Sequence, residues 1–112
     1  MPCYAFAQPV QPGTMDAWKG YVAEMKGPRK AEYDASRQRA GLREEEVWLQ
    51  HTPMGDFAIV HLEADDIGKV FETFMTSQEP FDVWFRDNVL VGVHGMDMSA
   101  APPPMNEAIF GV

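Results

Sequence analysis

Residues 47–63 constrain the fold more than any other stretch, because they hold two apolar segments joined by a Pro-Met-Gly turn. Strand-forming segments separated by so short a turn predict a β-hairpin. With Met54 and Gly55 at the tip, the predicted cross-strand pairs are Thr52 with Phe57, Gln50 with Ile59, and Trp48 with His61.

The two faces of this hairpin differ in chemistry, because side chains alternate along a strand. One face is aliphatic and suits a covering of helices; it carries Val47, Leu49, Ala58, Val60 and Leu62. The other face mixes aromatic, aliphatic and polar side chains; it carries Trp48, Gln50, Phe57, Ile59 and His61. An apolar surface with a few polar groups is typical of a ligand cavity, so we expect a cavity on this second face.

Length and charge exclude several classes of protein. The 112 residues predict one domain with a modest core. Nine basic and 17 acidic residues give a formal net charge of -8, which repels nucleic acid and anionic lipid. No apolar run approaches the roughly 20 residues of a membrane span, and the N-terminus lacks a signal-peptide pattern. We therefore expect a cytoplasmic protein that binds neither nucleic acid nor membrane, and the single Cys3 excludes an internal disulfide.

Apolar spacing and turn residues predict the remaining elements. We expect strands over 4–10 and 90–98, helices over 14–26, 28–39 and 67–76, and one or two helical turns over 81–89. The alternating charges of residues 29–39 are typical of a solvent-exposed helix face, and a lid over a pocket mouth or a subunit contact are the alternatives. Residues 1–99 form the predicted domain, and the Pro-rich tail over 100–112 packs on the body or on a partner subunit.

The order strand, helix, strand, strand, helix, strand is that of a ferredoxin-like split βαβ sandwich, in the α+β class. This fold places helices on one face of a four-stranded antiparallel sheet. The other face, with Trp48, Phe57 and Ile59, is too apolar to stay in water. A second copy of the chain is the simplest cover, which predicts a homodimer.

The chain resembles the dimeric α/β-barrel superfamily, of the antibiotic-biosynthesis-monooxygenase type, by element order over residues 4–98. Val-Trp-Leu-Gln at 47–50, Thr-Pro-Met-Gly-Asp at 52–56 and Pro-Phe-Asp-Val-Trp-Phe at 80–85 are similar to signatures of a small bacterial family within it, whose function is unassigned. The resemblance implies two protomers packed sheet to sheet, with a cavity in each. The superfamily includes cofactor-independent monooxygenases, isomerases, polyketide cyclases and haem-degrading enzymes, so it does not select one activity.

The expected strand order brings two histidines to the cavity, His61 and His94, on either side of the first strand. We assign Tyr4, Phe6 and Gln8 to the cavity face of that strand, because Ala5 and Ala7 would let helices approach the opposite face closely. The predicted substrate-binding residues are Tyr4, Phe6, Gln8, Trp48, Gln50, Phe57, Ile59 and Met96. Such a pocket suits a flat, partly oxygenated organic ligand.

Two functions remain open at this point. In the first, His61 or His94 is the general base of a cofactor-independent isomerase, cyclase or monooxygenase, and Gln50 or Tyr4 hydrogen-bonds the developing oxyanion. The substrate would be aromatic or polyketide-like. In the second, the same residues hold a ligand without catalysis, in a binding or regulatory dimer.

Neither function requires a metal or a cofactor. The three histidines and the cysteine lack HxH, HExxH and CxxC spacing, so the sequence predicts no metal site. Haem binding is a minor alternative that the resemblance implies, because some members of the superfamily bind haem through a histidine.

Overall fold

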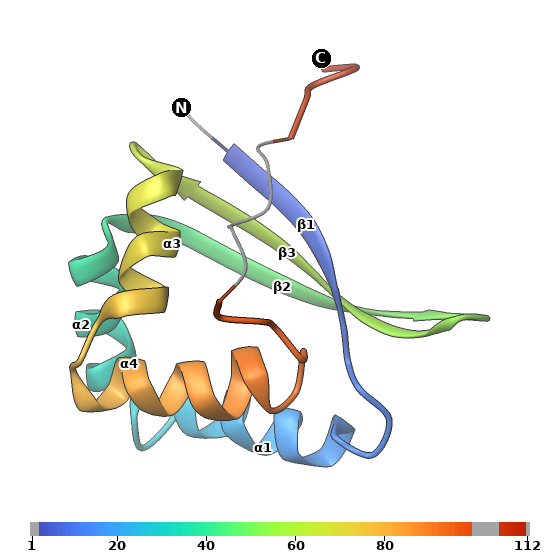
Figure 1. Ribbon diagram of the computed structural model, residues 1–112, viewed down its shortest axis with the longest axis horizontal. Helices are drawn as coiled ribbons and strands as arrows, with labels where there is room; N and C mark the ends of the chain where they lie inside the picture. The colour runs from blue at the N-terminus through green and yellow to red at the C-terminus, as the bar shows by residue number, and fades with distance from the viewer. Residues whose placement is uncertain (1–2, 100–105, 112) are drawn as a thin grey trace.

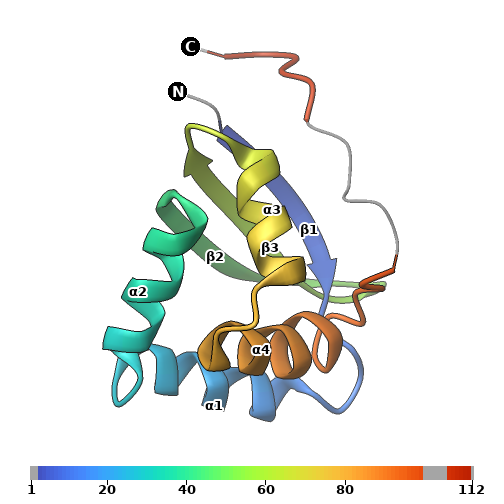
Figure 2. The ribbon, with the colours of Figure 1, turned by 60° about the vertical axis from the view of Figure 1, so that its left-hand side comes forward.

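The computed structural model describes residues 3–99 and 106–111, which form a three-stranded antiparallel sheet with helices on one face (Figures 1 and 2). The strands are β1 (Cys3–Pro9), β2 (Leu42–Thr52) and β3 (Gly55–Ala64), in the order β1-β3-β2. The helices are α1 (Met15–Lys26), α2 (Lys30–Ala40), α3 (Ile67–Thr76), α4 (Pro80–Phe85) and the π-helix η1 (Arg86–Val91). This confirms the α+β class. Within the described residues, no helix is long and apolar enough to cross a membrane.

The β2-β3 hairpin has the predicted faces and a register that differs from the prediction by two residues. Thr52 pairs with Gly55, so the loop is Pro53-Met54. The Thr52 hydroxyl holds this turn, because it accepts from the Met54 amide at 3.1 Å and donates to the Gly55 carbonyl at 2.7 Å. The observed pairs are Gln50 with Phe57, Trp48 with Ile59 and Glu46 with His61. A shift of two residues keeps every side chain on its face, so the face assignment is confirmed.

The predicted face of β1 is wrong. Tyr4 pairs with Leu62 and Phe6 with Val60, on the face that the helices cover. The Tyr4 ring lies 5.5 Å from the Phe71 ring of α3, edge to face. The helix layer therefore meets this edge strand with aromatic contacts, and Ala5 and Ala7 lie on the open face instead.

The predicted last strand over 90–98 is also wrong. Helix α4 continues directly into η1, and the hydrogen bonds from Gly92 N to Asp87 O and from His94 N to Val89 O keep the backbone helical beyond Val91. Alternation of Val91 and Val93 suggested a strand, but Phe85, Val89 and Leu90 continue the apolar helix face that starts at Phe81. The described residues therefore form three strands, and the predicted fourth strand is a helix and turns.

The other helix boundaries agree with the sequence prediction. Asp66 caps α3 by accepting from the Lys69 amide at 3.1 Å, and Gly41 ends α2 in the left-handed region at φ 75°. One core cluster joins the sheet to the helices; its largest side chains are Trp18, Tyr4, Phe71, Phe74, Phe81 and Phe85.

The described part of the tail touches the outer edge of β1. The Asn106 side-chain amide accepts from Ala5 N at 2.6 Å and donates to Ala5 O at 2.5 Å. It therefore makes the pair of backbone hydrogen bonds that a neighbouring strand would make. Residues 100–105 and 112 of the predicted tail lie outside the described residues.

Candidate functional site

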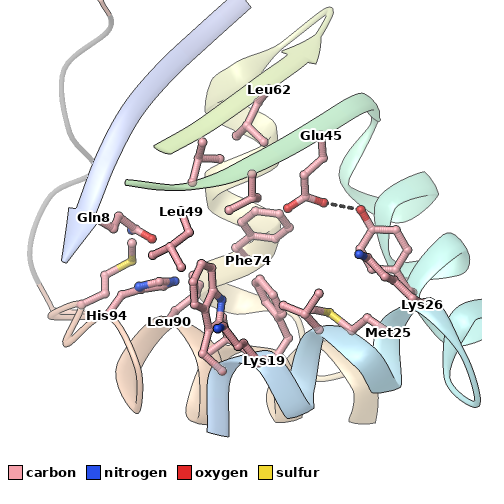
Figure 3. A pocket seen from close by; sticks show the side chains of 18 of the residues that line it. Gln8, Lys19, Met25, Lys26, Glu45, Leu49, Leu62, Phe74, Leu90 and His94 are labelled. Carbon is pink, nitrogen blue, oxygen red and sulfur yellow. Dashed lines mark hydrogen bonds between the residues drawn. The ribbon is translucent and has the colours of Figure 1, made fainter. Parts of the chain in front are cut away.

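A cavity of about 660 Å³ lies between the sheet and the helix layer (Figure 3). The strands contribute Phe6, Gln8, Glu45, Val47, Leu49, Val60 and Leu62. The helices and the segment after η1 contribute Trp18, Lys19, Val22, Ala23, Met25, Lys26, Lys30, Tyr33, Phe71, Phe74, Phe85, Val89, Leu90, His94 and Met96. This volume falls within the range of about 300–1,000 Å³ typical of small-molecule sites.

The position of α1 explains why the cavity exists. Helix α1 runs beside α4, where the Tyr21 and Trp84 rings meet edge to face at 5.6 Å, and it faces the sheet across the cavity (Figure 2). Val47 lies on the helix-facing side of β2 yet keeps 46% of its surface exposed. The aliphatic face is therefore only partly covered, and apolar surface remains available to a ligand.

The sheet separates the predicted site residues into two groups. Phe6, Gln8, His94 and Met96 line the cavity, and Tyr4 lies in the core on the same side. Trp48, Gln50, Phe57, Ile59 and His61 lie on the open face. The two histidines therefore do not share a site, and the expected oxyanion partner Gln50 is across the sheet from His94.

One end of the cavity holds two polar groups with unused hydrogen-bonding capacity. Gln8 is only 9% exposed, and its side-chain amide makes no hydrogen bond to another described residue and points toward Leu49 (Figure 3). His94 is 7% exposed and its Nδ1 lies 2.8 Å from the Pro9 carbonyl oxygen. Because a carbonyl only accepts, Nδ1 must carry the proton, which leaves the lone pair of the neutral ring on Nε2.

Burial sets the charge of this imidazole. Desolvation lowers the pKa of His94, and the hydrogen bond to Pro9 offsets only part of that effect. The neutral form therefore dominates at neutral pH. The Trp18 ring packs edge-on against the imidazole, with 5.9 Å between ring centroids, and fixes its plane.

At the other end, the polar groups are already paired. The Tyr33 hydroxyl donates to Glu45 at 2.6 Å, and Arg37 Nε donates to the same carboxylate at 2.8 Å. Burial, followed by the charge of Glu45, raises the pKa of the Tyr33 phenol far above its ordinary value, so this phenol is no acid for catalysis. Arg37 itself is buried and stacks on the rings of Tyr33, Phe74 and Phe85. The solvent-exposed face predicted for residues 29–39 is thus wrong at Arg37.

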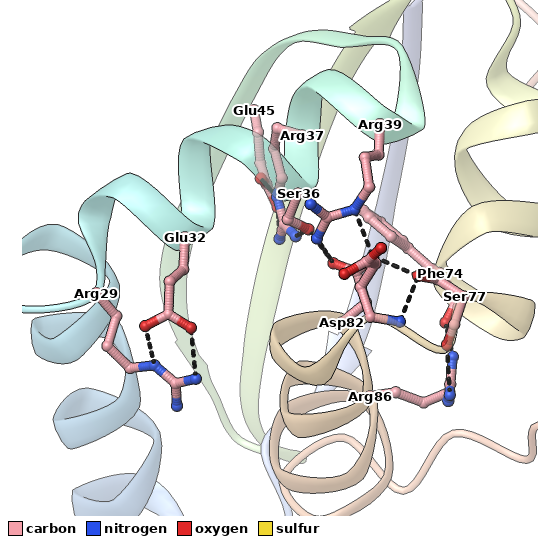
Figure 4. Close-up of polar contacts among 11 residues, drawn as sticks. Arg29, Glu32, Ser36, Arg37, Arg39, Glu45, Phe74, Ser77, Asp82 and Arg86 are labelled. Carbon is pink, nitrogen blue, oxygen red and sulfur yellow. Dashed lines mark hydrogen bonds and ion pairs between the residues drawn. The ribbon is translucent and has the colours of Figure 1, made fainter.

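A polar network extends from this pair to α4 (Figure 4). Arg37 Nη1 donates to Ser36 Oγ at 3.1 Å, and Ser36 Oγ donates to the buried Asp82 carboxylate. Asp82 also accepts from Arg39 at 3.1 and 3.2 Å and from Ser77 Oγ at 2.6 Å. Helix α2, which carries one wall of the cavity, is therefore tied to α4 by buried hydrogen bonds.

The open face divides into an acidic end and an apolar end. Glu44, Glu63 and Cys3 lie across its acidic end, where the contact with Glu63 raises the pKa of Glu44. The next cross-strand pair on this face is Glu46 with His61, and His61 Nδ1 lies 3.7 Å from the Glu46 carboxylate. The apolar end carries Trp48, Ile59, Phe57 and Ala7, and Trp48 keeps 53% of its surface exposed.

The sequence reasoning missed the contribution of α1 to the site. The sequence predicts a helix over 14–26 but assigns none of its residues to the site, whereas Trp18, Lys19, Val22 and Lys26 line the cavity, with Trp18 also in the core. One signal was available in Glu45, which strand alternation places beside Val47 and Leu49 on the helix-facing side. A carboxylate there needs a cation from the helix layer, which would have indicated that Arg37 is buried.

No group of three or more His, Cys, Asp or Glu side chains within residues 3–99 and 106–111 is arranged to hold a metal ion. Comparison with protein-family models, with curated proteins and with solved structures found no match.

Proposed function

We propose that the protein binds a small organic molecule in the cavity between α1 and the sheet. The observation that carries this proposal is the cavity of about 660 Å³, whose mostly apolar lining includes Gln8, a little-exposed residue whose side-chain amide makes no hydrogen bond to another described residue. Every fully buried side-chain nitrogen or oxygen among the described residues has a hydrogen-bond partner, so the Gln8 amide keeps contact with the open space of the cavity, where a ligand can supply its hydrogen bond.

Replacing Leu49 by tryptophan tests the site, because Leu49 points into the cavity from β2 (Figure 3). The neutral dye N-phenyl-1-naphthylamine is the probe, since its fluorescence rises in an apolar environment. We expect the wild type to bind about one dye per chain, and Leu49→Trp to weaken binding by at least about tenfold by filling the space. Fluorescence titration measures both affinities.

Gln50→Trp is the matched control, because Gln50 is the next residue of β2 and lies on the opposite face. This variant should bind the dye like the wild type. Equal affinity in the wild type and Leu49→Trp, with circular dichroism showing both folded, would rule out the cavity as the binding site.

A second candidate function is acid-base catalysis by His94 alone. It is favoured by the hydrogen bond from Nδ1 to Pro9, which leaves Nε2 as a neutral base in the cavity. His61 has no such position, since it lies on the open face beside Glu46. An aromatic or polyketide-like substrate with an acidic C–H or O–H group fits this arrangement, and the cofactor-independent chemistry expected from the sequence then needs only one histidine.

We expect nitrogen NMR of the ring to show Nδ1 protonated and Nε2 unprotonated at pH 7. The apparent pKa of His94 should lie below the ordinary value of about 6.5, because burial disfavours the charged ring. His94→Asn identifies the resonances by removing them. A ring that is protonated on Nε2 alone, or that titrates above about 6.5, would exclude His94 as the base.

We further propose that a second copy of the chain covers the open face, as the superfamily resemblance implies. The support is the partly exposed apolar end around Trp48, which lies on the face opposite the helices. The acidic end would then lie at the rim of the interface, where water and salt screen its charge.

A further inference from the structure

The charges that line the cavity differ in sign from those of the whole chain. Among the described residues, the lining includes the three lysines Lys19, Lys26 and Lys30, and a single carboxylate, Glu45. The chain as a whole has a formal net charge of -8. The cavity is therefore a locally basic site in an acidic protein.

Pairing of these groups leaves two positive charges. Arg37 neutralises Glu45 through hydrogen bonds of 2.8 and 3.3 Å, and Asp34 neutralises Lys30 at 3.0 Å. Lys19 and Lys26 have no carboxylate within ion-pair distance among the described residues. The carboxylates of Glu45 and Asp34 are thus already paired, and the α1 lysines are the charges of the lining left to a ligand.

The two lysines lie on one side of α1. They are seven residues apart, which is about 10 Å along a helix, and each has a flexible stem that can reach a common point. Figure 3 shows both on the α1 border of the cavity, with Lys26 toward the end that holds Glu45 and Lys19 between Lys26 and the end that holds Gln8 and His94. The lining between the two ends of the cavity is apolar and includes Leu49, Phe74 and Leu90.

We propose that the ligand is an anionic amphiphile, an organic acid whose apolar body fills the cavity and whose carboxylate or sulfonate group lies between Lys19 and Lys26. The distal end of the molecule carries a polar group that meets Gln8 and His94. This inference rests on the proposed binding function, because it assigns the ligand of the same cavity.

Two dyes with one ring system separate charge from shape. N-phenyl-1-naphthylamine is neutral, and 1-anilinonaphthalene-8-sulfonate adds one sulfonate to the same skeleton. The wild type should bind the sulfonate dye more tightly, and raising NaCl should weaken the sulfonate dye alone, since salt screens exposed charges. In Lys19→Gln/Lys26→Gln, we expect the dissociation constant of the sulfonate dye to rise about tenfold and that of the neutral dye to stay unchanged.

Lys69→Gln is the matched control, because Lys69 is an exposed lysine of α3 outside the cavity lining and has no ion pair among the described residues. It should change neither affinity. If the neutral dye binds but the double variant holds the sulfonate dye as tightly as the wild type, the anionic ligand is refuted and the binding cavity stands. If the neutral dye itself fails to bind, both the cavity function and this inference fall.

Discussion

Replacing Asp82 by alanine is expected to lower the free energy of unfolding by about 3 kcal/mol or more. Asp82 is buried and accepts hydrogen bonds from Arg39, Ser36 and Ser77 (Figure 4). Removing one partner of a buried ion pair leaves the other groups without compensation, which costs about 3–5 kcal/mol. Because Arg39 remains one third exposed and can regain water, we place the effect near the lower end. Urea unfolding followed by circular dichroism measures it.

Asp34→Ala is the control, because Asp34 pairs with Lys30 on the exposed side of α2. The same substitution there should change stability by less than about 0.5 kcal/mol. Equal effects at the two positions would mean that Ser36, Ser77 and Arg39 find new partners, and that α2 is held by other contacts.

The stability contribution of Asp82 should depend on pH with a known sign. Burial raises its pKa, but the hydrogen bonds from Arg39, Ser36 and Ser77 outweigh burial and lower the pKa below the ordinary value. A lowered pKa in the folded state stabilises the fold above the unfolded-state pKa of about 3.9, and this contribution is lost as pH falls through the folded value. The stability difference between the wild type and Asp82→Asn should therefore be full at pH 7 and shrink below about pH 4.

The hairpin illustrates what the sequence can predict. Alternation in β2 and β3 determines which side chains share a face, because one face must be buried under helices. The loop chemistry was ambiguous by two residues, since Pro53, Met54 and Gly55 allow either tip. An error of two residues preserves the faces, so the prediction of the faces survived a wrong register.

The wrong predictions came from segments whose apolar residues fit more than one arrangement. In β1 both alternating sets are largely apolar, and only the packing of Phe71 against Tyr4 selects the face. In residues 90–98 the alternation of a strand competes with a helix face continuing from α4, and the i to i-5 hydrogen bonds of η1 accommodate both Val89 and Leu90 in the core. These two errors together placed His94 on the wrong side of the sheet relative to α1.

The cavity was unpredictable for a related reason. Its described walls come from five helices, the segment after η1 and three strands, and its volume depends on how far α1 lies from the sheet. Apolar spacing in α1 indicates that one face is buried, but it does not tell packing against a sheet from facing a partly open cavity. Gln8 and His94 were identified as site residues, although the cavity they line lies on the other face of the sheet.

Replacing Trp48 by glutamate should convert the expected homodimer into a monomer. Trp48 is 53% exposed on the open face, next to Ile59 across the strands. A buried tryptophan at an interface typically contributes about 2 kcal/mol or more, and two-fold symmetry counts the loss twice. The resulting change of about 4 kcal/mol corresponds to about a thousandfold weaker dimer, before the repulsion between the two new carboxylates is added. Sedimentation velocity should give twice 12.6 kDa for the wild type and 12.6 kDa for Trp48→Glu.

Val91→Glu serves as the control, because Val91 is 41% exposed on η1, in the helix layer and away from the open face. It should sediment as the wild type does.

Salt gives an independent test, since Glu44, Glu46 and Glu63 lie on the same face as Trp48. A second copy brings these carboxylates closer together, so added NaCl should strengthen the dimer by screening their repulsion while leaving the apolar contact in place. A wild type that sediments at 12.6 kDa at every salt concentration would show that Trp48 needs no second copy. The cavity between α1 and the sheet lies on the other side of the sheet from Trp48, so the proposed binding function would stand without a dimer.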